Sequence, residues 1–562
     1  DRNESFDTAL TPLEPVNGPD GTPLLSTVRT FGRDVRVGAW KMMVGRMPLY
    51  LLDTNYETNH PEDRELVTRL YAGGVDLRLR QEWILGIGGV RILRALGVQP
   101  GAWHSNEGHA AFMLVERLRE FAGQGVSTEE AVQRVRDASV FTTHTPVPAG
   151  HDTFSVDQVE ACVGPYWEEA GLSRDQFLQF GQHPGEETGR FHMTVVAMRL
   201  SRGINGVSSR HGQESRSIWT DLWGGRGEES VPIGHVTNGV HAGTWVAHPV
   251  IELLGRRLGP GWDAPSQDPA RFQGILELDE KELWVVHHRL KSVLLTRMRE
   301  DARRRWATQW KEAAHVVGAG TLLDPDALTI GFARRFATYK RADLMFRDHE
   351  RLRRLLVNER RPVQVIFAGK AHPADQPGKE VLQTVYGYTR DPDFQGRVAF
   401  LEDYDMHVAH LLVQGVDMWL NLPKVPMEAC GTSGIKAAMN GVPQTGTLDG
   451  WWHEGYEGSN GWAIPFADQD EQTDEADATH LYELLEQETV PAYYERDARG
   501  IPLEWVNHMR QAMRVAFQRF SARRMVQDYV RDYYIPAIRG HQGADDPPVA
   551  PVTAIPQEPP QD

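Results

Sequence analysis

The sequence predicts an α/β protein built on parallel β-sheet. Short apolar runs alternate with longer amphipathic stretches along most of the 562 residues, a pattern typical of strands connected by helices. In the second half, five such runs are each followed by a loop rich in Gly, Lys, Arg, Tyr or Glu and then by a helical stretch. The apolar content of 40% allows a large core, and the length predicts two to four domains or two large lobes.

The first half is predicted to begin with strands and to continue with amphipathic helices. Strands are predicted from runs rich in Val, Leu, Met and aromatic residues, at 35–43, 48–55 and 138–147. Helices are predicted where apolar residues recur every three or four positions, at 65–74, 77–96 and 108–121. This half is expected to form one lobe.

The second half starts near Gly239 and is predicted to be a doubly wound, Rossmann-like lobe. A long charged helix over 279–314 precedes the five predicted strands, which are 327–336, 363–371, 397–404, 416–423 and 442–450. In such a sheet ligands bind at the carboxyl ends of the strands, so the polar residues that follow each strand should converge on one site. We expect that site in a cleft between the two lobes.

Composition argues against several classes of function. The formal net charge is -17, from 60 Lys and Arg against 77 Asp and Glu, which repels nucleic acid. Two cysteines, Cys162 and Cys430, cannot form a disulfide framework, and no run of 18 uncharged apolar residues predicts a membrane helix. The first residues lack a signal-peptide pattern, so a cytoplasmic location is expected. Residues 541–562 have the composition of a disordered tail.

The stretch from Glu428 to Gly441, EACGTSGIKAAMNG, combines one amine with many small residues. Small residues allow backbone amides to approach a ligand closely. The run at 437–440 is predicted to open a helix, and a loop-to-helix junction of this kind favours an anion, most often phosphate. The function of Lys436 beside such a phosphate is the question that this stretch raises.

Four cations lie within eight positions in FARRFATYKR, directly after a predicted strand. They are Arg334, Arg335, Lys340 and Arg341. Several guanidinium and ammonium donors close together at a strand end suit the binding of phosphate. The alternative interpretation is a solvated basic turn, since charge runs usually lie at the surface.

Several polar or aromatic segments allow two interpretations. The loops TTHTPVPAGHD at 142–152 and HVTNGVHAGTW at 235–245 contain His and Asn side chains that suit sugar hydroxyls, although each alone could be turn chemistry. Trp451 and Trp452 are either core residues or a flat platform for a sugar ring. The spacing of His104 and His109 differs from that of a helical zinc pair, so no metal site is predicted.

Eight motifs, in order along the chain, give rise to a family resemblance. They are LRLRQEWILGIGG, NEGHAAF, TTHTPVPAGHD, VTNGVHAGTW, RRFATYKR, GKAHPAD, LEDY, and EACGTSGIKAAMNG followed by TLDGWW. From about Val35 to Pro536 the chain resembles the α-glucan (glycogen or maltodextrin) phosphorylases, particularly their bacterial and archaeal branch. Eight motifs in family order are far more specific than any one of them.

The resemblance implies an α/β enzyme of GT-B architecture, with two Rossmann-like lobes and a cleft between them. Residues 1–238 would be the remainder of an N-terminal glucan-binding lobe, and residues 239–540 the lobe that binds pyridoxal 5′-phosphate (PLP). The cofactor would form a Schiff base with Lys436. The residues implied to bind the cofactor are Lys436, Thr432, Ser433, Arg334, Tyr404 and Trp245.

The resemblance also implies phosphorolysis of α-1,4-glucan by inorganic phosphate, with retention of configuration and with the PLP phosphate as a proton relay. The catalytic set would be Lys436, Arg335, Lys340 and His144, of which Arg335 and Lys340 bind the substrate phosphate. The sugar would be bound by His144, Asn238, Tyr339, Glu428, Cys430 and Gly431. The resemblance leaves homo-oligomerisation open.

Two departures from the family pattern shape these expectations. The well-studied animal enzymes have Ser where this chain has Cys430, and a thiol is a poor hydrogen-bond donor. Family members also have a Gly-rich loop of the GGLG kind upstream of the first matched strand, and its amides contact the substrate phosphate. The chain is therefore expected to be either a piece of a longer protein or a relative that has lost this phosphate-binding loop. Two alternative functions are a non-catalytic glucan-binding relative and a GT-B glycosyltransferase of the glycogen synthase type.

Overall fold

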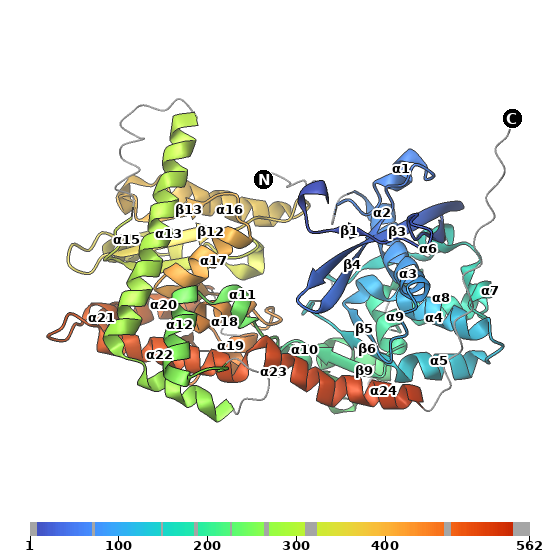
Figure 1. Ribbon diagram of the computed structural model, residues 1–562. Coiled ribbons are helices and arrows are strands. Elements are labelled where there is room, and N and C mark those ends of the chain that lie inside the picture. Colours follow the sequence, from blue (N-terminus) through green and yellow to red (C-terminus); the bar gives the residue numbers. More distant parts are fainter. Residues whose placement is uncertain are drawn as a thin grey trace. The chain divides into compact units, whose positions relative to one another are not determined.

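The computed structural model describes residues 8–69, 73–147, 150–184, 189–224, 227–262, 269–308, 323–465 and 474–542 (Figure 1). Within these ranges helices alternate with the strands of two parallel sheets, which confirms the predicted α/β class. Of the predicted tail, 541–562, the first two residues end the last helix, and the others lie outside the described residues.

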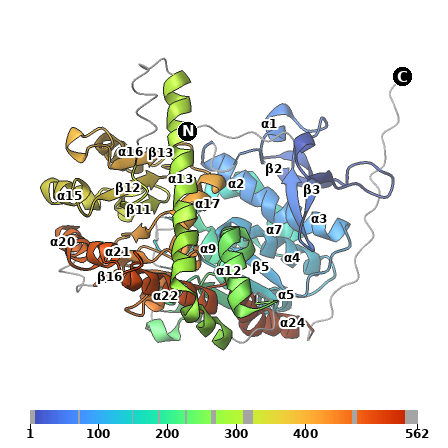
Figure 2. The ribbon, with the colours of Figure 1, turned by 60° about the vertical axis from the view of Figure 1, so that its left-hand side comes forward.

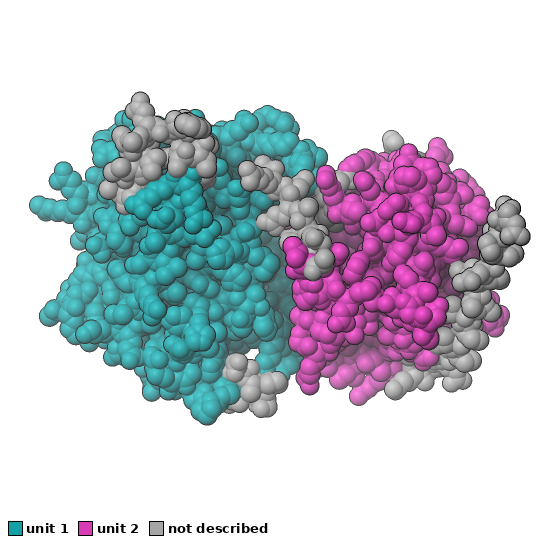
Figure 3. All heavy atoms as spheres, turned by 45° about the horizontal axis from the view of Figure 1, so that its top comes forward, with its two compact units in different colours: residues 1–2, 207–211, 236–527 teal, residues 3–206, 212–235, 528–562 magenta. Residues whose placement is uncertain are grey.

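The chain divides into two compact units, which Figure 3 colours separately. Unit 1 comprises residues 1–2, 207–211 and 236–527, and unit 2 comprises residues 3–206, 212–235 and 528–562. Each unit has its own hydrophobic core. Unit 2 is discontinuous in sequence, because its last segment follows the whole of unit 1 along the chain.

Unit 1 is built on a six-stranded parallel sheet. In spatial order its strands are β13 (Val398–Leu401), β12 (Val363–Ala368), β11 (Leu328–Ala333), β14 (Met418–Asn421), β15 (Gln444–Thr447) and β16 (Gly461–Ile464). The first five lie within the five predicted strands, and β16 lies outside them. The order proceeds outward from β11 on one side and from β14 on the other, so the sheet is doubly wound and its switch point lies between these two strands.

The helices of unit 1 pack around this sheet. They are α11 (Ala242–Trp245), α12 (His248–Leu258), α13 (Glu280–Thr308), α15 (His349–Leu356), α16 (Gln376–Tyr388), α17 (Met406–Gly415), α18 (Thr432–Met439), α19 (Trp451–Gly455), α20 (Asp474–Leu484), α21 (Val490–Tyr494), α22 (Leu503–Arg519) and α23 (Ala522–Tyr529), whose last two residues belong to unit 2. The predicted long helix is α13, which packs against α17 and α12 (Figure 2). Of its predicted range, residues 309–314 lie outside the described part of the chain.

Unit 2 contains a four-stranded parallel sheet and a separate antiparallel sheet. The parallel sheet has the spatial order β10 (Ile233–His235), β9 (Gly203–Gly206), β6 (Ser139–Thr142) and β5 (Trp103–Asn106). The antiparallel sheet consists of β1 (Glu14–Pro15), β2 (Ser26–Thr30), β3 (Arg33–Val44) and β4 (Met47–Asp53). A further pair is formed by β7 (Thr153–Ser155) and β8 (Arg190–His192).

The helices of unit 2 include one long interrupted helix, in which α2 (Val75–Trp83) continues through a π-helical segment into α3 (Gly89–Ala95). The others are α1 (Pro61–Arg64), α4 (Phe112–Ala122), α5 (Thr128–Asp137), α6 (Val156–Val163), α7 (Tyr166–Glu169), α8 (Arg174–Gly181), α9 (Met193–Arg199), α10 (Ser209–Ile218), which starts in unit 1, and α24 (Ile535–Gln542). In the part of the chain that the structure describes, no helix has both the length and the apolar character needed to cross a membrane.

The predicted helix over 65–74 is wrong for the residues that the structure describes. Residues 65–69 form turns and bends, and 70–72 lie outside the described ranges. The side-chain amide of Gln81 donates hydrogen bonds to Leu66 O at 2.8 Å and to Arg69 O at 2.9 Å. These carbonyl groups are therefore satisfied by a tertiary contact instead of by the next turn of a helix.

Candidate active site

The doubly wound sheet of unit 1 brings polar residues together at its switch point. Arg334 directly follows β11, and Asn421 is the last residue of the neighbouring strand β14. The Arg334 guanidinium donates hydrogen bonds to Asn421 Oδ1 and to Glu428 Oε2. Parallel strands place their carboxyl ends at one edge of a sheet, so this convergence follows from the strand order. For these residues the predicted convergence is confirmed.

Two cations meet on the carboxylate of Glu428. This side chain is buried, and its Oε2 accepts a hydrogen bond from Lys340 Nζ at 2.7 Å as well as one from Arg334. Burial acts to raise the pKa of Glu428, but the charges of Arg334 and Lys340 outweigh it and the pKa is lowered. Burial, with Arg334 beside it, lowers the pKa of Lys340 to about 8. Because two cations share one carboxylate, the cluster has an excess of positive charge, which suits the binding of an anion.

The remaining members of the basic segment differ from one another. Arg335 is exposed, and Tyr339 is half-buried with Lys340 Nζ 4.6 Å from its ring centroid. Arg341 is buried, and its Nη1 lies 2.6 Å from Asp477 Oδ2 while its Nε donates to a backbone carbonyl after β14 at 2.8 Å. Arg341 therefore stabilises the fold through buried contacts. The alternative interpretation of this segment, a solvated basic turn, holds only for its exposed residues.

Helix α18 begins at Thr432 and not, as predicted, within residues 437–440, which contain its last turn. The prediction was wrong because Gly431, at φ 79° and ψ 49°, turns the chain in the left-handed region and lets the helix start directly after it. Thr432 and Ser433 thus lie in the first turn, where backbone amides have no preceding turn to bind. The Ser433 hydroxyl also accepts a hydrogen bond from Trp419 Nε1 at 3.2 Å.

The start of α18 lies beside the cation cluster. A Cβ added at Gly431 would lie 3.3 Å from Asn421 Nδ2 and 3.4 Å from Glu428 Cγ. These are the two residues that accept hydrogen bonds from Arg334. Outward-pointing amides and paired cations are therefore neighbours within unit 1, an arrangement that suits phosphate.

Lys436 lies within α18 and is half-buried. Its Nζ is 3.6 Å from the centroid of the Trp245 ring, and that ring stacks on His410 with the centroids 4.3 Å apart. Burial lowers the pKa of Lys436, so a larger fraction of its amine is neutral and nucleophilic than in a solvated lysine.

Asn440 connects the segment around Trp245 to the end of α18 through hydrogen bonds. This buried side chain donates from Nδ2 to Trp245 O at 3.0 Å and to Lys436 O at 2.9 Å, and its Oδ1 accepts from Ala247 N at 2.8 Å. One side chain thereby fixes the backbone of the residue with the reactive amine and that of the aromatic residue beside it.

Three predicted residues of unit 1 lie outside these two groups of contacts. Tyr404 follows β13 and is half-buried, and burial raises its pKa. Burial also raises the pKa of the Cys430 thiol, which makes a thiolate nucleophile unfavourable there. The Asn238 backbone N–H donates to Val207 O at 3.0 Å, and its side chain is partly exposed. The sugar-binding roles of Asn238 and Cys430 stay predictions.

The donor set of unit 1 fits PLP. Lys436 supplies an amine for the aldehyde, and Trp245 is a flat aromatic surface beside that amine. The first turn of α18 offers amides to a phosphate. The Nε of Arg334 is buried and has no hydrogen-bond partner among the residues that the structure describes, so it adds a donor that suits an anion.

In unit 2, His144 lies on the loop after β6 and is exposed. Its ring Nε2 is 3.1 Å from Asn106 Oδ1, and its backbone N–H donates to Glu107 Oε2 at 2.7 Å. Every other predicted site residue belongs to unit 1.

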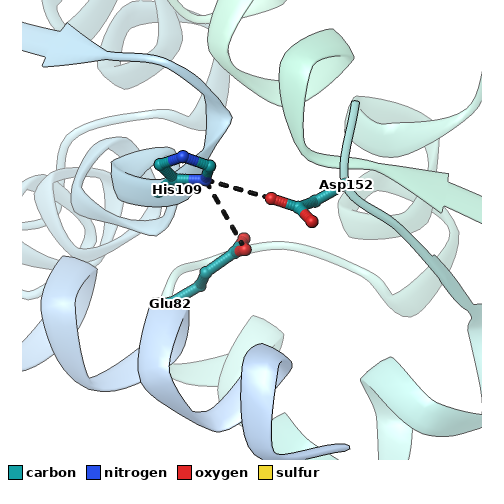
Figure 4. A group of neighbouring side chains, drawn as sticks. All are labelled: Glu82, His109 and Asp152. Carbon is teal, nitrogen blue, oxygen red and sulfur yellow. Dashed lines mark hydrogen bonds and ion pairs between the residues drawn. The ribbon is translucent and has the colours of Figure 1, made fainter. Parts of the chain in front are cut away.

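A second polar cluster of unit 2 consists of Glu82, His109 and Asp152, whose side chains point toward one another (Figure 4). His109 Nδ1 lies 3.0 Å from Asp152 Oδ2. Arg78 completes the cluster, with its Nε 2.8 Å from Glu82 Oε1 and its Nη2 2.9 Å from Asp152 Oδ2. Because the guanidinium of Arg78 already lies beside both carboxyl groups, we assign a polar network centred on Arg78 and not a metal site.

His104 and the paired tryptophans have structural roles, as their contacts and burial indicate. His104 lies 2.7 Å from Thr142 Oγ1 and 2.8 Å from Tyr534 OH, so its two ring nitrogens are both used away from the cluster of His109. Trp451 and Trp452 are each 1% exposed within the core of unit 1, so the core interpretation is correct and the sugar platform is wrong.

Sequence reasoning missed Asn421, Asp449, Asn440 and Glu107. Asp449 is buried, its Oδ2 accepts from the backbone N–H of Glu428 at 2.8 Å, and burial raises its pKa to about 7. Asn421 and Asp449 lie within the last three residues of the predicted strands 416–423 and 442–450, so the strand-end rule could have identified them. Asn440 and Glu107 lie within the motifs EACGTSGIKAAMNG and NEGHAAF, but no local pattern indicates the hydrogen bonds that they make.

Comparison with known proteins relates most of the chain to one family. The family model described as carbohydrate phosphorylase matches residues 72–454. A glycogen phosphorylase of Aquifex aeolicus is 40% identical over 525 residues, which cover 93% of this chain and 75% of the relative. A maltodextrin phosphorylase of Thermococcus litoralis is 40% identical, with 94% and 62% covered. A glycogen phosphorylase of Mycobacterium bovis is 42% identical, with 95% and 63% covered.

The chain thus spans 62% to 75% of the length of these relatives. The family model covers all the motif residues of the cation cluster and of α18. The resemblance that the eight motifs predicted is confirmed, and the chain belongs to the carbohydrate phosphorylase family, whose relatives named above are α-glucan phosphorylases.

Proposed function

We propose that the protein phosphorolyses α-1,4-glucan, such as glycogen, starch or maltodextrin, from the non-reducing end to give α-D-glucose 1-phosphate with retention of configuration. The observation that supports this most strongly is the cluster of Arg334, Lys340 and Glu428 beside the first turn of α18, since it provides two cations and backbone amides for phosphate. The names of the similar glycogen and maltodextrin phosphorylases support the same activity.

We further propose that the two units correspond to the two lobes of GT-B architecture. Each unit contains a parallel sheet of its own, as that architecture requires. Residues 1–238 would mainly bind glucan, and residues 239–540 would mainly bind the cofactor. The composition of the chain favours a cytoplasmic reaction.

The substrate phosphate is bound by Arg335 and Lys340 in this proposal. Fixed positive charge stabilises the phosphate while the glycosidic bond breaks and a cationic glucosyl centre forms. Glu428, Gly431, Asn238, Tyr339 and Cys430 bind hydroxyl groups of the sugar. His144 binds the sugar and directs a backbone carbonyl toward the developing positive charge.

The proposed cofactor is PLP bound through Lys436. Its phosphate would be held by Thr432, Ser433 and Arg334, and its ring by Tyr404 and Trp245. When bound, the cofactor supplies a phosphate group that exchanges a proton with the substrate phosphate. The lowered pKa of Lys436 favours the neutral amine that captures an aldehyde.

Reduction with borohydride followed by peptide mapping tests the cofactor assignment. We expect a pyridoxyl adduct on Lys436 in PLP-loaded protein, accompanied by an absorbance band of bound PLP. Lys436→Ala should lose the band, the adduct and all phosphorolysis of maltoheptaose. Lys281→Ala, at an exposed position of α13, should lose none of them and serves as the control.

The same preparation separates the competing functions. Glucan binding without release of glucose 1-phosphate would indicate a non-catalytic relative. Transfer from a nucleotide sugar, with no PLP bound, would indicate a glycosyltransferase of the glycogen synthase type. An adduct on a lysine other than Lys436 would contradict the cofactor site while leaving the reaction itself to be judged from product release.

A further inference from the structure

Glu107 is distinguished in unit 2 by its backbone conformation. Its φ of 65° and ψ of 172° lie in a region that is essentially restricted to glycine. A glutamate remains in such a conformation only where surrounding contacts hold it there. The contacts of Glu107 and of its neighbours should therefore explain why the residue adopts this conformation.

The backbone around Glu107 explains this sharp turn. The N–H of Glu107 donates to Thr142 O at 2.8 Å, which extends the pairing of β5 with β6. The next residue, Gly108, passes so close to the start of α9 that an added Cβ would lie 3.1 Å from both Met193 Cβ and Thr194 N. Glu107 therefore lies between the last residue of β5 and a glycine that packs directly against α9, so the chain has to turn sharply at Glu107.

The carboxylate of Glu107 accepts hydrogen bonds from three consecutive residues of the loop after β6. The donors are the Thr143 hydroxyl at 3.3 Å, the His144 backbone N–H at 2.7 Å and the Thr145 hydroxyl at 2.9 Å. The preceding residue, Asn106, lies 3.1 Å from the His144 ring. Two adjacent residues at the end of β5 thus hold both the backbone and the ring of His144.

The same loop is held at its other end by the cluster in Figure 4. Asp152 lies 2.9 Å from Arg78 Nη2 and 3.0 Å from His109 Nδ1. His109 follows Glu107 by two positions, so one short segment after β5 contacts the loop at both His144 and Asp152. The loop geometry consequently depends on that segment.

We propose that Glu107 is a positioning residue for His144. Its carboxylate fixes the backbone of His144, and through it the location of this residue against the sugar. The catalytic consequence rests on the proposed function, whereas the hold on the loop does not. The His144 N–H and the Thr145 hydroxyl share Oε2, and the Thr143 hydroxyl binds Oε1. Glutamine has the same size as glutamate, but it has one acceptor oxygen in place of two and lacks the negative charge that strengthens these hydrogen bonds.

The first test measures hydrogen exchange in the peptide that covers residues 141–147, in the full chain. Glu107→Gln and Glu107→Gly should each accelerate exchange of the His144 amide. Glu130→Gln, at an exposed position of α5, is the matched control and should leave it unchanged. Unchanged exchange in both Glu107 variants would overturn the proposal, whether or not the protein phosphorolyses glucan.

The second test separates positioning from general stability. Glu107→Gln should lower kcat for phosphorolysis about a hundredfold, the effect expected of a small misplacement of a catalytic group, with the KM for phosphate unchanged. Glu107→Gly relieves the backbone conformation, so it should melt no lower than Glu107→Gln while being as slow. Unaltered kcat, or a loss of activity matched by a loss of folded protein, would overturn the proposal. An inactive wild type would refute the proposed function, and the exchange experiment would still decide the role of Glu107.

Discussion

The polar sites of the two units are built in different ways. In unit 1, charged groups follow the ends of parallel strands and are buried against one another, so that Lys340 has a pKa of about 8 and Asp449 one of about 7. In unit 2, an exposed histidine lies on a loop whose backbone and hydroxyl groups are held by Glu107. Strand order assembles the first site, and a single unusual backbone turn assembles the second.

This difference indicates which perturbations each site should resist. Buried charges in unit 1 are mutually dependent, so removal of one changes the pKa of the others. The loop of unit 2 depends on hydrogen-bond geometry, so a neutral substitution of similar size can displace it. Charge variants should therefore discriminate among the residues of unit 1, and neutral isosteres among those of unit 2.

The largest expected effect concerns two arginines of the same segment. Arg335→Ala should raise the KM for phosphate and lower kcat about a hundredfold to a thousandfold. The reason is that the substitution removes a fixed positive charge that stabilises the transition state. Arg341→Ala should instead lower the melting temperature, because Arg341 is buried and paired with Asp477. Steady-state kinetics at varied phosphate, together with thermal unfolding, measure both. Equal kinetic effects without a difference in stability would mean that the segment acts as a diffuse positive field.

A smaller effect is expected from the pH dependence of Lys340. Its lowered pKa of about 8 means that the charge needed for phosphate is lost as pH rises through that value, so phosphorolysis should fall there. Lys340→Arg should move this fall to higher pH. Glu428→Gln removes the carboxylate that opposes the lowering, so it should move the fall to lower pH. Profiles of kcat/KM against pH for the three proteins are the measurement, and a fall at the same pH in all of them would contradict the assignment.

The smallest expected effect is a difference in stability between variants of Glu82 and Asp152, the two acidic residues beside His109. Burial raises the pKa of Glu82 well above its ordinary value, so Glu82→Gln mimics the protonated acid and should change stability little. Burial also acts to raise the pKa of Asp152, but hydrogen bonds from His109 and Arg78 outweigh it and the pKa is lowered. Asp152→Asn should therefore cost about 1–3 kcal/mol at neutral pH.

The acid range provides the control for that comparison. The stability due to the Asp152 carboxylate is present above its ordinary pKa of 3.8 and is lost as pH falls through the lower value in the folded protein. The difference between wild type and Asp152→Asn should thus shrink only in strong acid. Urea unfolding at several pH values measures it, and a larger cost for Glu82→Gln than for Asp152→Asn would refute the assignment of charge.

The sequence predicted the sheet of unit 1 better than the sheets of unit 2. The strands from β11 to β14 are apolar, and most of their residues are buried, so their composition marks them. By contrast, β9 has the sequence GING and β10 has IGH, and such short, glycine-containing strands do not differ from loops in composition. The wrong helix over 65–74 depends on Gln81, a contact that no local pattern reveals.

The convergence of the strand-end residues was predicted, whereas other features of the candidate site were not. Motif residues such as Arg334, Lys340 and Glu428 converge because strand order brings them together, and the motifs identified them. The start of α18 was misplaced because the left-handed Gly431 ends the preceding loop earlier than composition suggests. Glu107 was missed because the donors that bind its carboxylate, and its unusual φ, depend on tertiary contacts that a single sequence does not display.

The discontinuity of unit 2 affects the order in which the protein forms on the ribosome. Tyr529 OH lies 3.0 Å from Asn205 Nδ2 and 3.2 Å from Thr142 Oγ1, and Tyr534 OH lies 2.8 Å from His104 Nδ1. These contacts to β5, β6 and β9 can therefore form only after residues near the end of the chain have been synthesised. All strands of the unit 1 sheet precede Tyr529, so a nascent chain should acquire the cluster of Arg334, Lys340 and Glu428 before these contacts complete unit 2.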